Sequence, residues 1–357
     1  MRILVNDLAA SASGAMSVLK SFYQYVREND NENEYIFLLS DDYLEETERI
    51  KVKIISEVKK SGFHKLYFDL LSGKKILNQY NPDYVISLQN ILTFGYKGKQ
   101  AVFVHQAIPF QRRKRFSFFK KEERAYAFIQ TVVGYFIKKS IKKADLVFVQ
   151  TEWMKRAIIR ECRISKNVIH IIPPEVKIDN KYQYKLESNQ FLYPAAFENT
   201  YKNQNCIYEA SDILRNKGYT NYEIVLTLDK YHQQKSGCKF VGLLDRGHLY
   251  EYYSTSVLLF PSYVETVGLP LVEAMSVGSI ILVADCEYSR EILTEYKNAY
   301  YFDPFKPQQL AQLMEYIIQG KIVICDQEKI ITPINSGWSL LLEKVESDVQ
   351  YSEEKIK

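Results

Sequence analysis

Short runs of apolar, β-branched and aromatic residues alternate with longer polar segments along most of this chain. The runs have the length of buried strands rather than of helices. They are Ile3–Val5, Tyr35–Leu39, Val52–Ile55, Tyr84–Leu88, Ala101–Val104, Leu146–Val149, Val168–Ile172, Phe191–Tyr193, Ile224–Leu228, Lys239–Val241, Val257–Phe260, Ile280–Val283 and Tyr300–Phe302. The first segment between runs places Ala15, Val18, Leu19, Phe22 and Val26 on one helical face. Strands separated by segments of helix length predict parallel β-α-β units.

The alternation is interrupted once, by a polar stretch that begins at the double proline Pro173-Pro174. We expect a linker at residues 173–189. The units on either side predict two doubly wound, Rossmann-like α/β domains that face a central cleft, at residues 1–172 and 190–334. An amphipathic helix is expected in the last segment, 335–357. A chain of 357 residues is long enough for two domains of common size.

Two glutamates, Glu265 and Glu273, border the loop and helix that follow the strand Val257–Phe260. Gly268 precedes that helix and Pro270 lies in its first turn, a layout that presents backbone N–H groups to an anion. Because Gly268 has no Cβ, a ligand can approach the main chain closely there. A carboxylate accepts hydrogen bonds from two hydroxyls at once, which suits the diol of a ribose or a hexose. The alternative is a solvent-facing helix start with two incidental acidic residues.

The residues around this loop resemble a known family signature. Pro261-Ser262, Glu265, Gly268-Leu269-Pro270 and Glu273-Ala274-Met275 match the two-glutamate (EX7E) signature of retaining glycosyltransferases with the GT-B fold, the family-four group. Further matches are Phe240-Val241-Gly242, Gly278, Ile280–Val283, Glu291-Ile292 and Asp303-Pro304. The resemblance is strong from residue 190 to residue 315 and weaker before that, and it implies that the C-terminal helix crosses back to the first domain.

The resemblance implies that the first domain, residues 1–172, binds the acceptor and that the second domain, residues 190–334, binds the nucleotide sugar. Glu273 would hold the ribose hydroxyls. Glu265, together with the N–H groups of Thr266, Val267, Gly268 and Leu269, would hold the donor sugar and its phosphate. Lys202, at the opening of a helix, would stabilise the leaving diphosphate. Many members of the family also have a Gly-Arg pair several residues before this lysine, whereas this chain has Ala195-Ala196. Either Lys202 carries the phosphate alone or another cation substitutes for the arginine.

Two candidates come from the first domain. Gly14 lies in a turn of small residues after the first strand, where the family usually has a pair of glycines and where a positive φ is available to glycine. His105 directly follows the strand Ala101–Val104, and the family places a histidine there against the donor sugar and the reacting centre. Turn geometry alone for Gly14 and a structural hydrogen bond for His105 are the alternatives. Thr151, which follows the strand Leu146–Val149, is expected to cap a helix.

The amino-acid composition indicates the cellular compartment of the protein and whether it needs a metal. Five cysteines without paired spacing argue against a disulfide framework and a zinc site, and for a reducing compartment. The chain shows no signal peptide and no bilayer-spanning run, so a cytoplasmic protein is expected. The histidines lack metal-ligand spacing and no Asp-x-Asp pair follows a strand, so neither a metal nor another cofactor is expected. Asp41-Asp42 is expected to open a helix.

Residues Phe110–Lys143 differ from the rest of the chain, with eleven basic residues against two acidic ones and with interleaved aromatic residues. This mixture favours an anionic membrane surface. A solvated helical face whose aromatic residues are core is the alternative. Nucleic acid would attract the same charge, but no nucleic-acid-binding motif accompanies the segment, so no nucleic-acid partner is expected.

These observations predict a retaining glycosyltransferase that moves a hexose-type sugar from a nucleotide sugar to a glycan or lipid-linked acceptor. The expected setting is bacterial surface polysaccharide synthesis at the inner face of the plasma membrane. Two alternatives remain open, a GT-B sugar-nucleotide epimerase and a non-catalytic homologue that binds a sugar nucleotide. The base, the sugar and the acceptor are not evident from the sequence.

Overall fold

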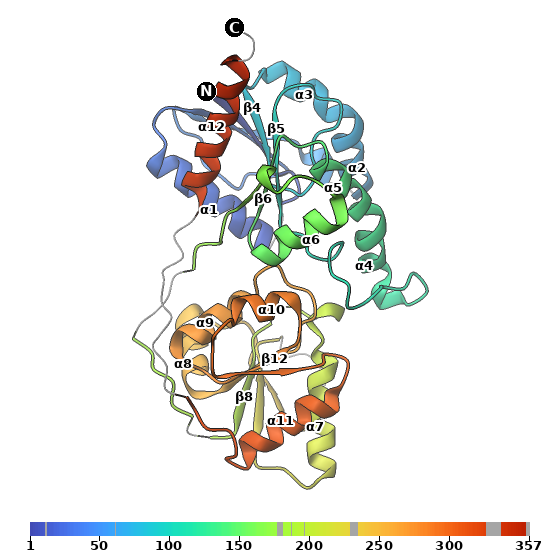
Figure 1. The fold of residues 1–357 in the computed structure, drawn as a ribbon, viewed down its shortest axis with the longest axis vertical. Helices are drawn as coiled ribbons and strands as arrows, with labels where there is room; N and C mark the ends of the chain where they lie inside the picture. The colour runs from blue at the N-terminus through green and yellow to red at the C-terminus, as the bar shows by residue number, and fades with distance from the viewer. Residues whose placement is uncertain are drawn as a thin grey trace.

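Two parallel β-sheets follow one another along the chain, each with helices on both faces (Figure 1). The computed structural model describes residues 1–10, 13–60, 62–176, 181–186, 188–195, 197–228, 235–325 and 337–354. In Figure 1 the first sheet forms the upper domain and the second sheet the lower one. This is the doubly wound, two-domain α/β architecture that the alternation of strands and helices predicts.

The first sheet has the order β3-β2-β1-β4-β5-β6-β7, with every neighbouring pair parallel. Its strands are β1 (Arg2–Asn6), β2 (Glu34–Leu39), β3 (Ile50–Ile54), β4 (Tyr84–Ser87), β5 (Gln100–Val104), β6 (Leu146–Val149) and β7 (Ile169–Ile171). In the register of the sheet, Val5 lies between Phe37 and Ile86. The strand order reverses direction at β1, so ligands are expected at the carboxyl ends of β1 and β4.

The second sheet repeats this pattern, with the order β10-β9-β8-β11-β12-β13. Its strands are β8 (Gln190–Tyr193), β9 (Glu223–Leu226), β10 (Cys238–Phe240), β11 (Val257–Phe260), β12 (Ile281–Ala284) and β13 (Ala299–Phe302). The runs identified in the sequence all form strands, with ends that differ by one or two residues. The central strands are buried because helices cover both faces of a parallel sheet, whereas the edge strands β3, β10 and β13 are only partly buried.

The helices of the first domain are α1 (Ser13–Asn29), α2 (Gly62–Tyr67), α3 (Gly73–Tyr80), α4 (Arg124–Phe128), α5 (Gly134–Ile141) and α6 (Glu152–Cys162). Those of the second domain are α7 (Gln204–Asn216), α8 (Arg246–Thr255), α9 (Leu269–Val277), α10 (Glu287–Ile292) and α11 (Pro307–Ile318). Short 3-10 turns cover Ser56–Lys60, Lys121–Glu123, Lys166–Val168 and Thr200–Lys202. One expectation is wrong: Asp41 and Asp42 open no helix, and Asp41 instead pairs with Lys59 at 2.6 Å.

The C-terminal helix α12 (Trp338–Glu354) packs on the first domain, at the top of Figure 1 beside the N-terminus. The indole ring of Trp338 lies 5.1 Å from the ring of Phe22 and 5.5 Å from that of Phe103, measured between centroids. Asp348 accepts a hydrogen bond from the Tyr84 hydroxyl at 3.1 Å. The described part of the stretch between the two sheets runs along the second domain, where Tyr184 N–H donates to the Val277 carbonyl.

Candidate functional site

The loop between β11 and α9 forms the centre of the candidate site. Gly268 is the N-cap of α9, with φ of 80°, a left-handed conformation that favours glycine. Pro270 lies in the first turn of the helix, and Gly278 ends it with φ of 90°. A Cβ on Gly268 would stand 3.4 Å from side-chain atoms of Phe260, Leu271 and Tyr288, so the conformation rather than crowding requires glycine. Pro270 has no N–H and the Leu271 N–H donates to the Gly268 carbonyl at 2.8 Å, so an anion at the helix N-terminus would be received by the N–H of Leu269 and those of the preceding loop.

Glu265 and Lys202 are in direct contact. The Lys202 ammonium lies 2.6 Å from Oε1 of Glu265, and the Ser262 hydroxyl donates to the same oxygen at 2.7 Å. Both side chains of the ion pair are largely buried. Lys202 ends the 3-10 turn ahead of α7, and Asn203 holds that turn in place through hydrogen bonds from its amide to the carbonyls of Pro261 and Pro304. The structure therefore brings together two residues that are far apart in sequence and that we expect to share a phosphate.

Glu273 lies on α9 with its Oε2 accepting a hydrogen bond from the Tyr253 hydroxyl at 2.9 Å. Burial raises the pKa of the Glu273 carboxyl, while the Tyr253 hydrogen bond and the nearby Arg246 act in the opposite direction. Tyr253 is on α8 and is almost completely buried. Sequence inspection did not single out this tyrosine, because its link to Glu273 depends on how α8 packs against α9.

The other residues of the loop have different surroundings. Val267 is buried among Val176 and Val272, whereas the side chain of Leu269 is exposed. The Thr266 carbonyl points away from the helix mouth and accepts hydrogen bonds from the first domain. Any ligand contacts of Thr266, Val267 and Leu269 would therefore be made by their backbone N–H groups.

His105 follows β5 at the carboxyl edge of the first sheet. Its backbone N–H and that of Gln106 donate to Oδ1 of Asn90 at 2.7 and 2.9 Å. Desolvation lowers the pKa of the His105 imidazole to about 4, so the ring is neutral near neutral pH. Within the described residues, the His105 side chain makes no hydrogen bond to Glu265, Lys202 or Glu273.

Gly14 lies in the first turn of α1. Its φ is not positive, and a Cβ added there would meet no atom within 4 Å among the described residues. Neither conformation nor packing in the described structure requires glycine at this position. The preceding residues Ser11 and Ala12 lie outside the described ranges.

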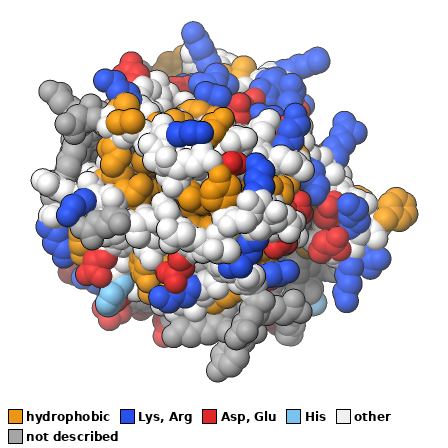
Figure 2. Space-filling view, turned by 90° about the horizontal axis from the view of Figure 1, so that it is seen from below, with side chains coloured by type: hydrophobic (Ala, Val, Ile, Leu, Met, Phe, Trp, Pro, Cys, Tyr) orange, Lys and Arg blue, Asp and Glu red, His pale blue; other side chains and the backbone are white. Residues whose placement is uncertain are grey.

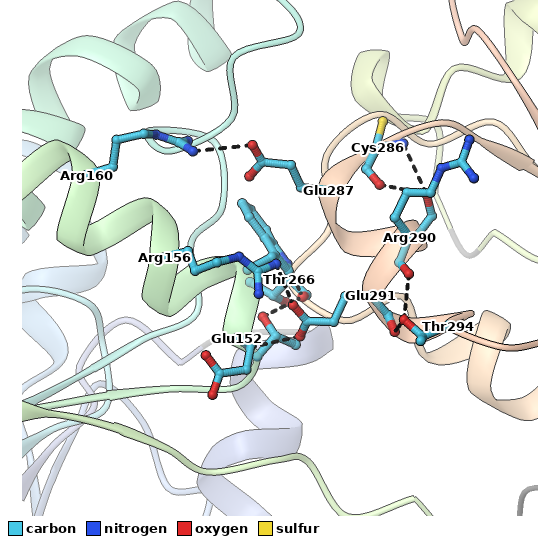
Figure 3. A network of polar contacts seen from close by, with 12 residues as sticks. Glu152, Arg156, Arg160, Thr266, Cys286, Glu287, Arg290, Glu291 and Thr294 are labelled. Atoms are coloured by element: carbon cyan, nitrogen blue, oxygen red, sulfur yellow. Dashed lines mark hydrogen bonds and ion pairs between the residues drawn. The ribbon is translucent and has the colours of Figure 1, made fainter. Parts of the chain in front are cut away.

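A network of polar contacts joins the start of α6 to the second domain (Figure 3). The Thr151 hydroxyl and the Trp153 indole both donate to the Thr266 carbonyl, at 3.2 and 2.7 Å. Thr151 occupies the N-cap position of α6 as expected, but its side chain makes no capping hydrogen bond and contacts the second domain instead. The first domain thus holds the candidate phosphate-binding loop directly.

The same network extends to α10. The Glu152 N–H donates to Glu291 at 2.8 Å, Arg156 pairs with Glu291 at 3.1 Å, and Arg160 pairs with Glu287 at 3.3 Å (Figure 3). The four side chains of the two ion pairs, Arg156, Arg160, Glu287 and Glu291, border a hollow of about 550 Å³ between the domains. Each pair takes its cation from α6 and its acid from α10, so the contact fixes how the two domains meet at this point.

The basic and aromatic segment Phe110–Lys143 makes a second contact between the domains. The Tyr126 hydroxyl donates to Asn199 at 2.9 Å, and the rings of Tyr126 and Tyr201 lie 5.5 Å apart. The Lys114 ammonium lies 5.8 Å from the Tyr263 ring centroid. These second-domain residues flank Lys202 and Glu265 in sequence, so part of the segment supports the candidate site.

Other residues of the segment are engaged within the first domain. Phe110 and Phe116 are buried in the core. Four of the segment's cations form ion pairs: Arg112 and Lys138 with Glu161 at 2.6 and 3.4 Å, and Lys114 and Lys120 with Glu123 at 2.8 and 3.8 Å. The loop ahead of α4 projects outward in Figure 1, and Phe119 in that loop is 94% exposed. From below, Figure 2 shows acidic and basic side chains interspersed rather than one continuous basic face.

Two features of the described residues concern metals and membranes. In those ranges, no group of three His, Cys, Asp or Glu side chains is arranged to hold a metal ion. No helix there combines the length and apolar character needed to cross a bilayer. The cysteines in the same ranges are free thiols.

Comparison with known proteins identifies the class of the second domain. Residues 175–331 match the family described as "Glycosyl transferases group 1". The chain is also similar to the O-antigen chain mannosyltransferase RfbU of Salmonella typhimurium (strain LT2). The two are 24% identical over 288 residues, which cover 73% of this chain and 80% of RfbU. The chain therefore carries a glycosyltransferase group 1 domain, and both similarities support a glycosyltransferase.

Solved structures show the same fold. Sucrose-phosphate synthase from Thermosynechococcus elongatus superposes with a TM-score of 0.67 at 14% identity, covering 100% of this chain and 98% of that one. The lipopolysaccharide outer core galactosyltransferase WaaB, in its apo form, has a TM-score of 0.63 at 16% identity, covering 99% and 100%. HepE from Anabaena, in complex with UDP-glucose, has a TM-score of 0.60 at 14% identity, covering 100% and 99%. The architecture is GT-B, with two Rossmann-like domains.

Proposed function

We propose that this protein is a retaining glycosyltransferase that moves a hexose-type sugar from a nucleotide sugar to a glycan or lipid-linked acceptor in bacterial surface polysaccharide synthesis. The observation that carries the proposal is the Lys202–Glu265 ion pair at the mouth of α9, within a glycosyltransferase group 1 domain. It places a cation, a carboxylate and free N–H groups at one helix N-terminus. The similarity to an O-antigen mannosyltransferase and to a lipopolysaccharide galactosyltransferase supports the biological setting.

In this proposal each residue has a defined task. Glu273 accepts hydrogen bonds from the ribose hydroxyls, and burial has already removed it from bulk water. The donor phosphate lies at the N-terminus of α9, where Lys202 balances the charge that develops as the sugar–phosphate bond breaks. Glu265, which contacts Lys202 in the free protein, then orients the donor sugar.

The proposed reaction proceeds by displacement on one face of the sugar. The bond from the anomeric carbon to the phosphate oxygen breaks as the acceptor hydroxyl approaches from the same side. The acceptor proton passes to the departing phosphate oxygen, and the anomeric configuration is retained. A double displacement of the hydrolase type needs two carboxylates that flank the anomeric carbon. In the proposed roles, Glu265 is paired with Lys202 and Glu273 binds the ribose, so neither is free to act as the nucleophile.

The donor can be identified by thermal stabilisation of the protein against UDP, GDP, ADP and CMP sugars. A ligand at 100 times its dissociation constant raises the free energy of unfolding by about 2.7 kcal/mol. Glu273→Gln is the matched variant and should weaken nucleotide binding by about 1.5–3 kcal/mol, because a charge-assisted acceptor is lost. Stabilisation by none of the four classes, or by one class equally in both proteins, would overturn the donor assignment.

Product analysis then separates transfer from the alternatives. With the stabilising donor and a mixed glycan acceptor, a glycosyltransferase releases the free nucleoside phosphate and forms a new glycoside. Conversion of the donor sugar without release of the nucleoside phosphate would identify an epimerase instead. The assay is run with and without excess chelator, because we propose that Lys202 and α9 hold the phosphates without a metal. Loss of transfer in chelator, restored by magnesium or manganese, would contradict that part of the proposal.

A further inference from the structure

A cavity of about 450 Å³ lies in the first domain, at the carboxyl edge of its sheet. This volume falls in the range of roughly 300–1,000 Å³ that is typical of small-molecule sites. One wall is apolar and is formed by Leu66, Ile91, Phe128, Ile129, Val133 and Ile137. The wall comes from α2, from the loop after β4 and from the helical segment that runs from α4 into α5. The cavity is separate from Lys202, Glu265 and Glu273, which belong to the second domain.

The opposite wall carries a buried polar group that lacks a partner. Gln89 is 3% exposed, and its amide nitrogen donates to Asp69 at 2.8 Å. Asp69 is fully buried and pairs with Lys65 at 2.9 Å. Oε1 of Gln89 has no hydrogen-bond partner among the described residues. Such an acceptor costs about 1–3 kcal/mol unless a donor reaches it, and a ligand hydroxyl in the cavity would be a suitable donor.

Both helical walls of the cavity contain a π-helical turn. One covers Phe68–Ser72 between α2 and α3, and it includes Asp69. The other covers Ile129–Val133 between α4 and α5, and both of its end residues face the cavity. Such turns are rare and occur frequently at functional sites, because the extra residue changes which side chains point inward. Two such turns in the lining of one cavity point to a built site rather than to a packing gap.

The polar end of the cavity is connected to His105. Asn90 lines the cavity and has φ of 70°, an uncommon conformation for a residue other than glycine. Its Oδ1 accepts the backbone N–H groups of both His105 and Gln106. Gln106 also lines the cavity. A ligand hydroxyl at this end would therefore lie beside the residue that we expect at the reacting centre.

The apolar wall continues to the surface. Phe128 lines the cavity and is 38% exposed, so the cavity opens beside it. Val132 and Tyr135 follow at helical spacing and are also exposed, and Leu71 is exposed on the side of α2. In Figure 1, α2 and the α4–α5 segment adjoin on one side of the first domain. The apolar chain of a ligand longer than the cavity would therefore lie against this exposed apolar surface.

We propose, on the basis of the proposed glycosyltransferase function, that this cavity is the acceptor site and that the acceptor is amphipathic. Its sugar end lies against Gln89 and Gln106 beside His105, and its apolar chain lies along Phe128, Ile129, Val133 and Ile137. A free sugar would fill the polar end but would leave the apolar wall in contact with water. Transfer of the apolar chain from water to this wall supplies the selectivity for a lipid-linked sugar.

The test compares octyl and methyl glycosides of four common hexoses, each used below its micelle concentration. Binding to the full-length protein is measured by calorimetry without a donor. We expect at least one octyl glycoside to bind ten times or more as tightly as its methyl counterpart, with a negative heat-capacity change. Equal affinity of each octyl and methyl pair, or binding of neither, overturns the proposal. Donor stabilisation is measured separately, so failure of the proposed function is recognised independently.

Three variants localise the effect. Phe128→Ser should abolish the preference for the octyl glycoside, whereas Phe128→Leu should retain most of it. Val133→Trp should block the cavity. Phe119→Ser is the matched control, because Phe119 is exposed in the same basic segment but does not line the cavity. Loss of the preference in Phe119→Ser, or an unchanged preference in Phe128→Ser and Val133→Trp, would assign the binding to the surface and not to the cavity.

Discussion

The indole nitrogen of Trp153 donates a hydrogen bond to the Thr266 carbonyl at 2.7 Å, joining the first domain to the loop that links Glu265 to α9. Thr151 donates to the same oxygen. Two donors from the first domain thus hold one carbonyl of the loop that precedes α9. The position of the candidate phosphate site therefore depends on the contact between the domains.

Replacing Trp153 with Phe should weaken donor binding as well as stability. The variant loses one hydrogen bond and part of a buried ring, so the free energy of unfolding should fall by about 1–3 kcal/mol. Trp338→Phe is the matched control, because the Trp338 indole donates to Ser21 at 2.9 Å within the first domain and far from the loop. Denaturation and donor titration of both variants check the prediction. A similar donor affinity in the two variants would mean that Trp153 has only a structural role.

Lys202→Met should reduce turnover by about 10- to 100-fold, since a charge-assisted interaction of about 1.5–3 kcal/mol is lost as the diphosphate leaves. Lys217→Met provides the comparison. Lys217 pairs with Glu315 at 2.7 Å, nearly the same geometry, but on the surface between α7 and α11. Steady-state kinetics of the two variants distinguish a role in the reaction from loss of an ion pair. Equal turnover of both variants would mean that Lys202 has no specific role in the reaction.

The His105 imidazole should remain neutral throughout the physiological range. Because desolvation lowers its pKa from 6.5 to about 4, its NMR titration should have a midpoint near pH 4. Because the pKa is lowered on folding, the folded state binds fewer protons than the unfolded state between pH 4 and 6.5. The free energy of unfolding contributed by His105 should therefore decrease as the pH falls through that range. His248 is the internal reference, because its pairing with Asp245 raises its pKa. A His105 midpoint at or above 6.5 would contradict the desolvated position.

Turnover should depend on His105 more than donor affinity does. His105→Ala removes a group that we expect to contact the reacting sugar, so kcat should fall while donor binding changes little. Single-turnover kinetics and donor titration of this variant give the two quantities. Unchanged turnover in His105→Ala would mean that His105 has only a structural role.

Asp7→Asn should stabilise the protein at neutral pH. Burial raises the pKa of the Asp7 carboxyl to about 7, opposed by Lys65, and neither carboxylate oxygen has a hydrogen-bond partner among the described residues. A raised pKa means that the folded state binds the extra proton, so wild-type stability falls as the pH rises from about 4 to about 7. Over that range the variant should gain up to about 4 kcal/mol relative to wild type, since each pKa unit corresponds to about 1.36 kcal/mol. Denaturation at pH 4, 5.5 and 7 measures the gain, and the exposed Asp42→Asn should show none.

Vesicles rich in anionic lipid should bind the protein through the projecting loop ahead of α4. Changing Phe119, Lys120 and Lys121 to Ser should reduce co-sedimentation, because these side chains are exposed. Lys120 approaches Glu123 only to 3.8 Å, whereas Arg112 and Lys114 are held in closer ion pairs at 2.6 and 2.8 Å. Binding should weaken with salt as the screening length shortens to about 8 Å near physiological strength. Lys51→Ser with Lys53→Ser removes two charges from an edge strand and should have no effect. Equal sedimentation of all three proteins would mean that the loop is a solvated surface.

The strands, the two parallel sheets and the glutamate loop could all be predicted from the amino-acid sequence. Local patterns suffice for these features, because buried strands are short apolar runs and because Gly268 and Pro270 mark a helix start from their own backbone preferences. The sequence also marked Thr151 as the residue ahead of α6. It did not indicate where the hydroxyl of that residue would point.

Contacts between residues that are distant along the chain depend on tertiary packing. The pairing of Lys202 with Glu265, of Tyr253 with Glu273 and of Trp153 with Thr266 depends on how helices and domains pack, which no local pattern encodes. The same holds for the cavity beside Gln89, because its lining residues are spread from Ala9 to Ile137 in sequence and meet only in the folded domain. Local sequence preferences determine where helices and strands form. The burial of apolar surface between those helices and strands determines which side chains come into contact.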